Sequence, residues 1–175
     1  MNYYALRTNE QSTVSTIVRA TASTTMPFGN LSWYLDEINI NDICFIKISG
    51  DDALKSISYD NSLVAIVKVI RRPYDIHVPL GMVMPHGTID LEFLDIFNGI
   101  VADDLYKFPT LKNTLSIGAS TKGVPNQAIG RLQHLQGEDI IKALIAEGRL
   151  THAHLSTYGI SNDSIEVLTS TIINV

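Results

Sequence analysis

The fold is decided by two apolar stretches, residues 43–49 (ICFIKIS) and residues 62–73 (SLVAIVKVIRRP). Both are rich in the β-branched residues Ile and Val, which favour strands. A polar segment, residues 50–61, joins them. We therefore expect an antiparallel strand pair that forms the central hairpin of a small β-barrel, with the paired arginines Arg71 and Arg72 at a basic rim.

Length and composition fit one globular domain. The chain has 175 residues, of which 45% are hydrophobic and 18% are charged, which is enough apolar material for a single core. We expect this domain over residues 1–148, followed by a C-terminal helical extension or linker over residues 149–175. Apolar runs stay well short of the about 20 residues that a membrane-spanning helix needs, and the polar start is unlike a signal peptide. These features predict a soluble cytoplasmic protein.

The other expected elements follow from local patterns. Aromatic and apolar alternation predicts strands at residues 3–7, 88–97 and 129–132. Apolar residues at helical spacing predict helices at residues 12–20, 31–38 and 137–148. Proline and glycine predict a loop at residues 22–30 and a long excursion over the barrel at residues 73–87.

Charge is spread unevenly along the chain. The net charge of −5 argues against nucleic-acid binding driven by counterion release over the whole surface. Three windows, residues 11–35, 61–74 and 105–137, contain no acid. If the fold brings them together, the protein presents one positive face to a polyanion. The alternative is chance clustering of solvated charges.

Recognisable catalytic and metal-binding motifs are absent from the sequence. The single cysteine, Cys44, lies in an apolar strand, which excludes an internal disulfide and a cysteine-based metal site. The five histidines form no His-Glu-x-x-His pattern, and no phosphate loop or nucleophile elbow occurs. We therefore expect a binding module with no cofactor and no metal. The alternative enzyme is a small hydrolase or nuclease that uses Asp51 or Asp52 with His86.

A reader of a single nucleobase needs aromatic faces, hydrogen-bonding groups and cations for the flanking phosphates. Trp33 is the only tryptophan and lies in an acid-free window, and small polar residues end the strands expected to be neighbours. The candidate base-pocket residues are Thr8, Asn9, Asn30, Trp33, Tyr34 and Ser49. The candidate phosphate-binding residues are Arg7, Lys68, Arg71, Arg72, Lys122 and Arg131. The competing explanations are core packing for Trp33 and solvated strand ends for the arginines.

Three segments carry a family resemblance. Residues 3–9 (YYALRTN) resemble an opening aromatic strand that ends in a basic residue and Ser or Thr. Asn30, Trp33 and residues 38–46 (ININDICFI) resemble an Asn and a helix before a Gly-Asp turn, with Asn41 in place of the glycine. Residues 64–74 (VAIVKVIRRPY) resemble a G-I-x-x-V-x-x-x-P-Y strand, with Ala65 in place of the glycine. Together the segments resemble the EVE and YTH branches of the PUA-like superfamily, over residues 1–148.

That resemblance implies an α+β fold, a PUA-like twisted β-barrel flanked by short helices. It also implies a pocket for one base, often methylated, that is flipped out of RNA or DNA. The YTH branch uses a cage of aromatic rings, so Trp33 would need Tyr34, Phe28 or a residue of the segment 73–87 as partners. PUA-like domains also occur at the N-terminus of McrBC-type modification-dependent restriction nucleases.

Our hypothesis from the sequence is thus a module that recognises a modified base, in DNA rather than RNA, as part of a restriction system. Catalysis would reside in a fused or associated NTPase or nuclease, and no membrane is involved. The alternatives are an RNA-binding PUA-like protein, the small hydrolase or nuclease, and a protein-interaction domain.

Overall fold

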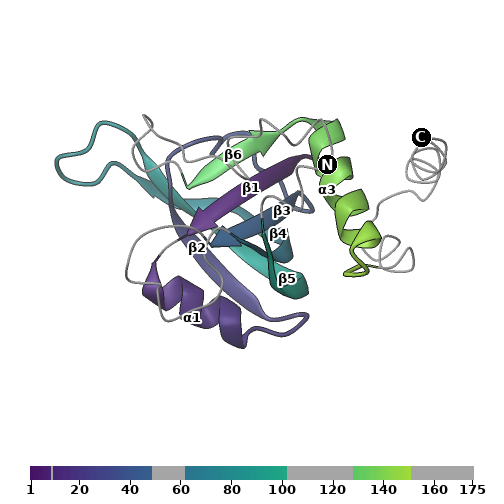
Figure 1. Cartoon of the computed structure of the whole chain (residues 1–175). Helices are drawn as coiled ribbons and strands as arrows, with labels where there is room; N and C mark the ends of the chain where they lie inside the picture. Colours follow the sequence, from purple (N-terminus) through teal and green to yellow (C-terminus); the bar gives the residue numbers. More distant parts are fainter. Residues whose placement is uncertain (9, 49–61, 102–127, 151–175) are drawn as a thin grey trace.

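A computed structural model of the chain describes residues 1–8, 10–48, 62–101 and 128–150 (Figure 1). Most of this part is sheet, with two helices. The elements in chain order are β1 (Tyr3–Thr8), α1 (Gln11–Arg19), β2 (Thr25–Leu31), β3 (Ile43–Ile48), β4 (Ser62–His77), β5 (His86–Val101), β6 (Ile129–Leu132) and α3 (His134–Ala146).

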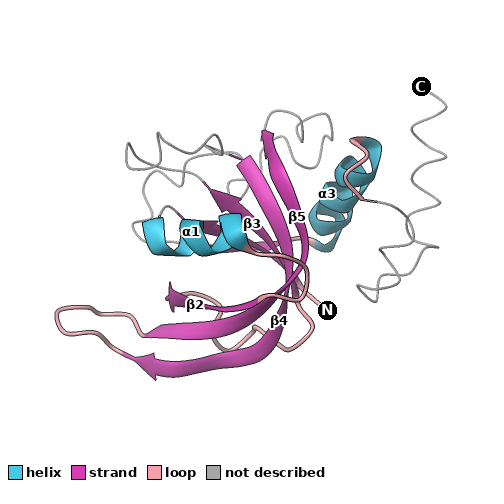
Figure 2. Cartoon of the chain, turned by 90° about the horizontal axis from the view of Figure 1, so that it is seen from below, coloured by secondary structure: helices cyan, strands magenta, loops and turns pink. Residues whose placement is uncertain are grey.

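The strands form one mixed, six-stranded sheet in the order β2-β5-β4-β3-β1-β6. β1 runs parallel to β3, and the other neighbouring strands are antiparallel. β4 and β5 are long, and repeated register shifts between them bend the sheet, which curls in Figure 2. Within the described residues β2 and β6 are the two edges and do not pair, so the sheet is open. The expected β-rich fold is confirmed, but the barrel is not closed.

Side chains alternate between the two faces of the sheet and build two hydrophobic clusters. On β1, Tyr3 and Ala5 belong to the cluster under α3, whereas Tyr4 and Leu6 belong to the cluster inside the curl. The helix α3 packs closely on β1, because Gly137 leaves room for the ring of Tyr3. Helix α1 closes the inner cluster through its buried residues Val14 and Ile17. The two helices therefore cover different faces.

Several elements predicted from the sequence are confirmed. The two apolar stretches form β3 and β4, which pair antiparallel from Ile43 opposite Lys68. The predicted helix at 12–20 is α1, and the short strand 129–132 is β6. The last helix, predicted over residues 137–148, instead spans His134–Ala146, so its predicted start at Gly137 is wrong.

Three further predictions were wrong. The expected loop at residues 22–30 contains β2, in which Met26 and Phe28 are buried and pair with β5. Pro27 suggested a loop, but a strand at a sheet edge tolerates a residue without an N–H. Residues 31–38 form turns rather than a helix, because Tyr34 adopts a left-handed φ of 61°. The segment 73–87 does not fold over a barrel but extends β4 and β5 as far as the pair His77 and His86.

The turn before β3 explains the substitution in the Gly-Asp pattern. Asn41 has a φ of 71°, a region that glycine favours and asparagine also adopts. The buried carboxylate of Asp42 accepts hydrogen bonds from the backbone N–H groups of Asn2 (2.7 Å) and Asn39 (2.9 Å). Asparagine thus preserves a turn that joins the start of β1 to the start of β3. No helix in the described part of the chain has the length and apolar character needed to cross a membrane.

Candidate functional site

A cavity of about 430 Å³ opens at the carboxyl end of β1, and we call it the strand-end pocket. Its volume lies within the range of about 300–1,000 Å³ that is typical of ligand sites. It is lined by Arg7, Thr8, Glu10, Thr13, Phe28, Gly29, Asn30, Met82, His86 and Ala128. Five segments far apart in the sequence contribute: the end of β1, the start of α1, β2, the β4–β5 hairpin and the residue before β6.

The wall supplied by β2 depends on an irregular backbone. The register between β2 and β5 shifts between Phe28 and Leu31, and Asn30 within this interval has a φ of 59°. Such bulges redirect a side chain next to a site, and left-handed backbone at a non-glycine residue is concentrated at functional sites. Asparagine is among the residues that adopt this conformation most readily. The bulge therefore lets a residue of an otherwise regular strand line the cavity.

The floor near α1 is held by hydrogen bonds within the protein. The hydroxyl of Thr8 accepts a hydrogen bond from the backbone N–H of Glu10 (3.3 Å). The carboxylate of Glu10 accepts hydrogen bonds from the hydroxyls of Ser12 and Thr13, each at 3.0 Å. Glu10 is therefore engaged in fixing the start of α1, whereas the hydroxyl of Thr8 can still donate its proton to a ligand.

Three side chains of the strand-end pocket have hydrogen-bonding capacity that the described part of the chain does not use. They are the guanidinium of Arg7, the amide of Asn30 and the imidazole of His86, none of which forms a side-chain hydrogen bond or ion pair with another described residue. Beside them, Phe28 presents a largely buried ring and Met82 a half-exposed thioether. A flat ring with polar edges matches this combination.

A second cavity, of about 490 Å³, lies at the opposite end of β1, and we call it the N-terminal cavity. It is lined by Met1, Asn2, Tyr3, Tyr34, Arg131, Leu132, Gln133 and His134. Arg131 forms an ion pair with Glu37. The imidazole of His134 lies 3.1 Å from a carboxylate oxygen of Glu138 and 5.3 Å, between ring centroids, from Tyr3. The guanidinium of Arg131 and the imidazole of His134 in this cavity are thus already engaged by carboxylates.

Tyrosine ionisation is suppressed at this end of the sheet. Burial, with a smaller contribution from Glu138, raises the pKa of Tyr3 to about 12. Burial and then the carboxylate of Asp42 raise the pKa of Tyr4 to about 12. Both phenols are therefore neutral at physiological pH.

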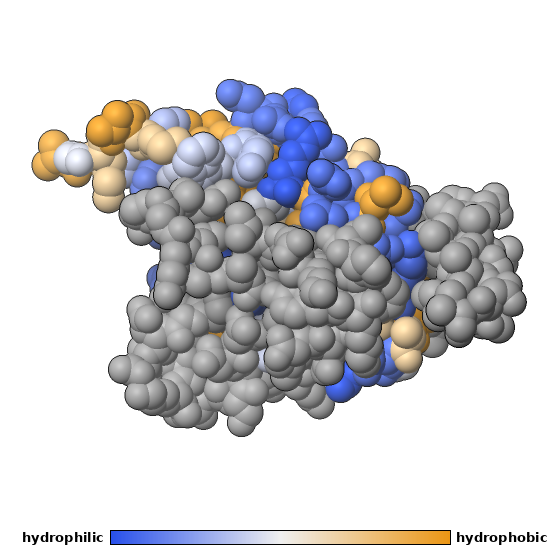
Figure 3. Space-filling view, turned by 45° about the horizontal axis from the view of Figure 1, so that its top comes forward, coloured by the Kyte–Doolittle hydropathy of each residue, from blue (hydrophilic) through white to orange (hydrophobic). Residues whose placement is uncertain are grey.

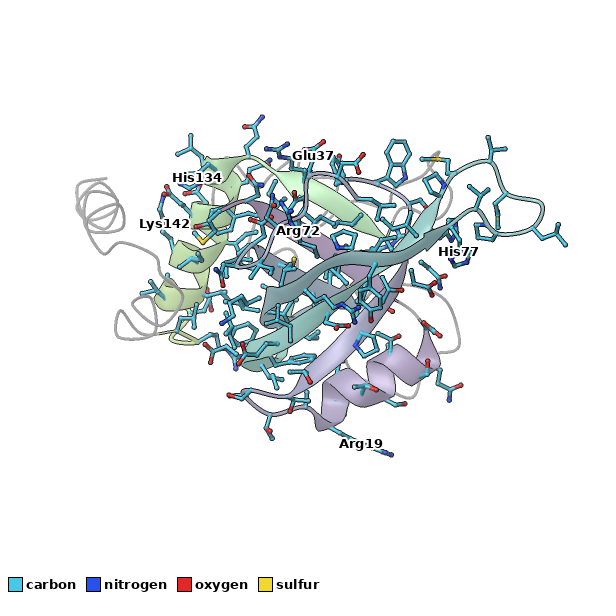
Figure 4. The ribbon with its side chains drawn as sticks, turned by 180° about the vertical axis from the view of Figure 1, so that it is seen from behind. Arg19, Glu37, Arg72, His77, His134 and Lys142 are labelled. Carbon is cyan, nitrogen blue, oxygen red and sulfur yellow. The ribbon has the colours of Figure 1, made fainter. Side chains whose placement is uncertain are left out.

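The basic residues of β4, among them Arg72, which is labelled in Figure 4, line neither cavity and are paired with neighbours. Lys68 forms an ion pair with Glu92 at 3.1 Å. Arg71 lies 3.7 Å from a carboxylate oxygen of Asp90 and 3.7 Å from the centroid of the Tyr74 ring. The hydroxyl of Tyr74 donates a hydrogen bond to Asp90 at 2.7 Å, which raises the pKa of Tyr74.

Arg72 on the same strand donates a hydrogen bond to the side-chain oxygen of Asn39. The acids of β5 therefore neutralise much of the charge that the acid-free window 61–74 was expected to present. Among the described residues, Lys68, Arg71 and Arg72 are thus paired cations and not an unpaired positive face, which was expected only if the fold brought the three acid-free windows together.

The structure brings together only some of the predicted site residues. Arg7, Thr8 and Asn30 meet in the strand-end pocket, together with His86 of the hydrolase alternative. Tyr34 and Arg131 line the N-terminal cavity. Trp33, which is 38% exposed, lines neither. Residues outside the described part of the chain are Asn9, Ser49, Asp51, Asp52 and Lys122.

Glu10, Thr13 and Met82 also line the strand-end pocket but were not singled out individually from the sequence, and Phe28 was named only as a cage partner. The alternation of Met26 and Phe28 was the signal available for the β2 wall. Met82 carries no local signal, because only the hairpin geometry brings it to the pocket.

No protein-family model and no curated protein matches the chain. Solved structures do match it. A hypothetical protein from Leishmania major aligns with a TM-score of 0.55 and 11% identity, over 86% of this chain and 98% of that one. Rpa0253 from Rhodopseudomonas palustris aligns with a TM-score of 0.56 and 13% identity, over 88% and 98%.

Human THYN1, in a crystal structure in complex with 5-methylcytosine containing DNA, aligns with a TM-score of 0.56 and 11% identity, over 82% of this chain and 97% of that one. At these identities the likeness shows a shared fold.

Proposed function

We propose that this chain is a DNA-binding module that holds one modified base in the strand-end pocket. The observation that supports it most is that Arg7, Asn30 and His86, beside the ring of Phe28, form no side-chain hydrogen bond or ion pair with another described residue. The fold shared with THYN1 makes 5-methylcytosine in DNA the first modification to test.

Five of the lining side chains have specific roles in this proposal. The Phe28 ring and the Met82 thioether contact the apolar surface of the base, while the Asn30 amide and the Thr8 hydroxyl bond to its polar edge. The guanidinium of Arg7 binds a flanking phosphate, with which it can form paired, charge-assisted hydrogen bonds. Because a base stacked in a duplex cannot reach such a pocket, the target nucleotide is flipped out of the helix.

The expected size of the discrimination is modest. Burying one additional methyl group contributes about 0.8 kcal/mol, or about fourfold in affinity. Selectivity well above this requires that the pocket also reject the unmodified base by leaving a polar group unpaired. The proposal therefore requires that modified DNA bind at least about fourfold more tightly than unmodified DNA.

The proposal also includes the biological system in which the module acts. The resemblance to domains found in McrBC-type systems supports a recognition module of a restriction system, whose catalysis belongs to an NTPase or nuclease in another domain or subunit. An RNA-binding PUA-like protein is the alternative that the same pocket chemistry serves.

Fluorescence anisotropy with matched oligonucleotides tests the proposal. The set contains duplexes with one 5-methylcytosine, one 5-hydroxymethylcytosine or one N6-methyladenine, the unmodified duplex, and methylated RNA of the same sequence. We expect at least one modified DNA duplex to bind several-fold more tightly than the unmodified one, and Asn30→Ala to reduce that preference. Equal affinity for all the DNA duplexes would refute the proposal, and a preference confined to RNA would establish the alternative.

A further inference from the structure

The tip of the β4–β5 hairpin exposes a continuous apolar surface. Residues 78–85 (VPLGMVMP) contain no charged side chain. The exposed fraction of the residue is near its maximum for Leu80 (105%) and Val83 (95%), and it is about half for Val78 (57%) and Met82 (49%). The hairpin projects from the body of the molecule in Figure 1, and its apolar tip is visible in Figure 3. Apolar surface concentrated in this way marks an interaction site.

The backbone holds these side chains outward in a defined turn. The N–H of Met82 donates a hydrogen bond to the carbonyl of Pro79 at 3.0 Å, and Gly81 has a φ of 79°. A positive φ at the third residue of such a turn is typical of type II, which places Leu80 at the apex. Two prolines, Pro79 and Pro85, restrict the loop further. The exposure of Leu80 and Val83 is therefore built into the hairpin.

The tip is continuous with the strand-end pocket. Met82 and His86, both on the hairpin, line that pocket. Their neighbours Leu80 and Val83 do not line it and stay exposed. A molecule seated in the pocket therefore contacts the hairpin at Met82, which is two residues from Leu80 and next to Val83 in the chain. In Figure 2 the hairpin and α1, which also contributes to the pocket, extend to the same side of the sheet.

We propose that Leu80 and Val83 form a wedge that enters the base stack of duplex DNA when the modified base moves into the strand-end pocket. This inference rests on the proposed function. Flipping a base leaves a gap in the stack, and DNA-bending proteins are known to insert apolar side chains such as Leu, Ile and Met between base steps. The uncharged tip matches the interior of the stack rather than the phosphate backbone.

The charge of the hairpin favours this occupant over a lipid surface. Residues 73–87 contain no Lys or Arg and include the acid Asp75. Segments that bind anionic membranes pair their apolar residues with Lys and Arg nearby. The hairpin has no such basic residues beside its apolar side chains. Two of its residues do line the pocket in which we propose that DNA binds, so DNA is the occupant that fits the tip better.

The test compares the full chain with its Leu80→Ser/Val83→Ser double variant by fluorescence anisotropy. One probe is a duplex with a single 5-methylcytosine and the other is the same modified strand without its complement. We expect the affinity of the variant for the duplex to be at least about tenfold lower than that of the parent chain. Its affinity for the single strand should equal that of the parent chain. Both side chains are exposed, so the replacements leave the fold intact. Leu135→Ser, which alters an exposed leucine (57%) on α3, is the matched control and should change neither affinity.

A second readout follows the stack itself. With 2-aminopurine next to the modified base, binding of the parent chain should raise the fluorescence of the duplex, and the double variant at saturating concentration should raise it less. An equal rise with both proteins would overturn the wedge.

The outcomes separate the wedge from the function on which it rests. If the parent chain prefers the modified base but the double variant keeps its duplex affinity, or loses both affinities equally, the wedge is wrong and the pocket stands. If the parent chain shows no preference for modified DNA in either form, the proposed function fails, and the wedge with it. A change from dimer to monomer on replacing Leu80 and Val83, with unchanged DNA affinity, would assign the tip to self-association and refute the wedge.

Discussion

The two cavities at opposite ends of β1 are similar in size but differ in the state of their polar groups. The N-terminal cavity holds about 490 Å³ and the strand-end pocket about 430 Å³, so volume does not distinguish them. In the former, Arg131 and His134 are paired with Glu37 and Glu138. In the latter, the Arg7 side chain has no ion-pair partner among the described residues. Unused hydrogen-bonding capacity, rather than space, is what marks a site for an external ligand.

The two cavities also differ in how the backbone forms them. The N-terminal cavity lies beside the close packing of α3 on β1, where Gly137 faces Tyr3. The strand-end pocket depends on the left-handed residue Asn30 and on an extended hairpin. Close packing predicts that changes near the first cavity affect stability, whereas changes in the second affect binding.

The largest expected effect is on stability, at the contact where α3 packs on β1. A Cβ on Gly137 would lie 2.2 Å from the ring of Tyr3, so Gly137→Ala should lower the free energy of unfolding by about 1–3 kcal/mol or more. Helix propensity alone would predict an increase of about 1 kcal/mol, so the sign of the change is diagnostic. Urea denaturation measures it.

A double-mutant cycle supplies the control for that substitution. In a Tyr3→Ala background the clash is absent, and adding Gly137→Ala should cost nothing further. A stabilising effect of Gly137→Ala in the parent chain would show that α3 does not pack on β1 as described.

The next effect separates the two arginines of the two cavities. Arg7→Gln should lower the affinity for modified DNA about tenfold or more, because a hydrogen bond to a charged group contributes about 1.5–3 kcal/mol. It should also reduce the slope of log K against log salt by about 0.9. Arg131→Gln, the matched control, should leave both unchanged, since Glu37 already holds this guanidinium. Equal losses from the two substitutions would end the distinction between the cavities.

A smaller effect on stability is expected at alkaline pH, from the two buried tyrosines of β1. Because the pKa values of Tyr3 and Tyr4 are raised to about 12, the folded chain resists losing these protons. Their contribution to stability is complete below pH 10 and is lost as the pH rises from 10 towards 12. At pH 11, each of the two tyrosines should lower the free energy of unfolding by about 1 kcal/mol relative to its value below pH 10.

Urea denaturation at pH 8 and pH 11 measures this loss. Tyr3→Phe and Tyr4→Phe should each reduce the difference between the two pH values. A stability that is flat over this interval would contradict the burial of both phenols.

The smallest effect concerns the paired cations of β4. Arg71 contacts Asp90 and Tyr74 while its side chain stays 59% exposed, and such pairs contribute at most about 1 kcal/mol. Arg71→Ala should therefore change stability and DNA affinity only slightly. If Arg71→Ala instead reduced the slope of log K against log salt by about 0.9, Arg71 would leave Asp90 to bind a phosphate when DNA is bound, which is the role predicted from the sequence.

The regular parts of the fold were predictable from local pattern, and the site was predictable only in part. Apolar runs identified β3 and β4, and periodicity identified α1 and α3. Thr8 was found because it ends a strand, and Asn30 because it matched the family pattern. Trp33 was favoured for its chemistry, yet it lines neither cavity.

The rest depends on pairings between distant residues. Lys68 and Glu92 lie opposite each other because β4 pairs with β5, and Met82 reaches the pocket because the hairpin extends beyond the sheet. Pro27 and Gly29 concealed β2, although an edge strand accommodates both residues. Register is set by packing over the whole sheet, which a local pattern does not encode.

The most direct test of the strand-end pocket is an NMR titration of the full chain with a duplex that carries the preferred modified base. We expect the amide signals of Thr8, Asn30 and His86 to shift most, while those of Asn2, Gln133 and His134 at the N-terminal cavity stay in place. Shifts concentrated at the N-terminal cavity, or spread without preference over both ends of β1, would contradict this expectation.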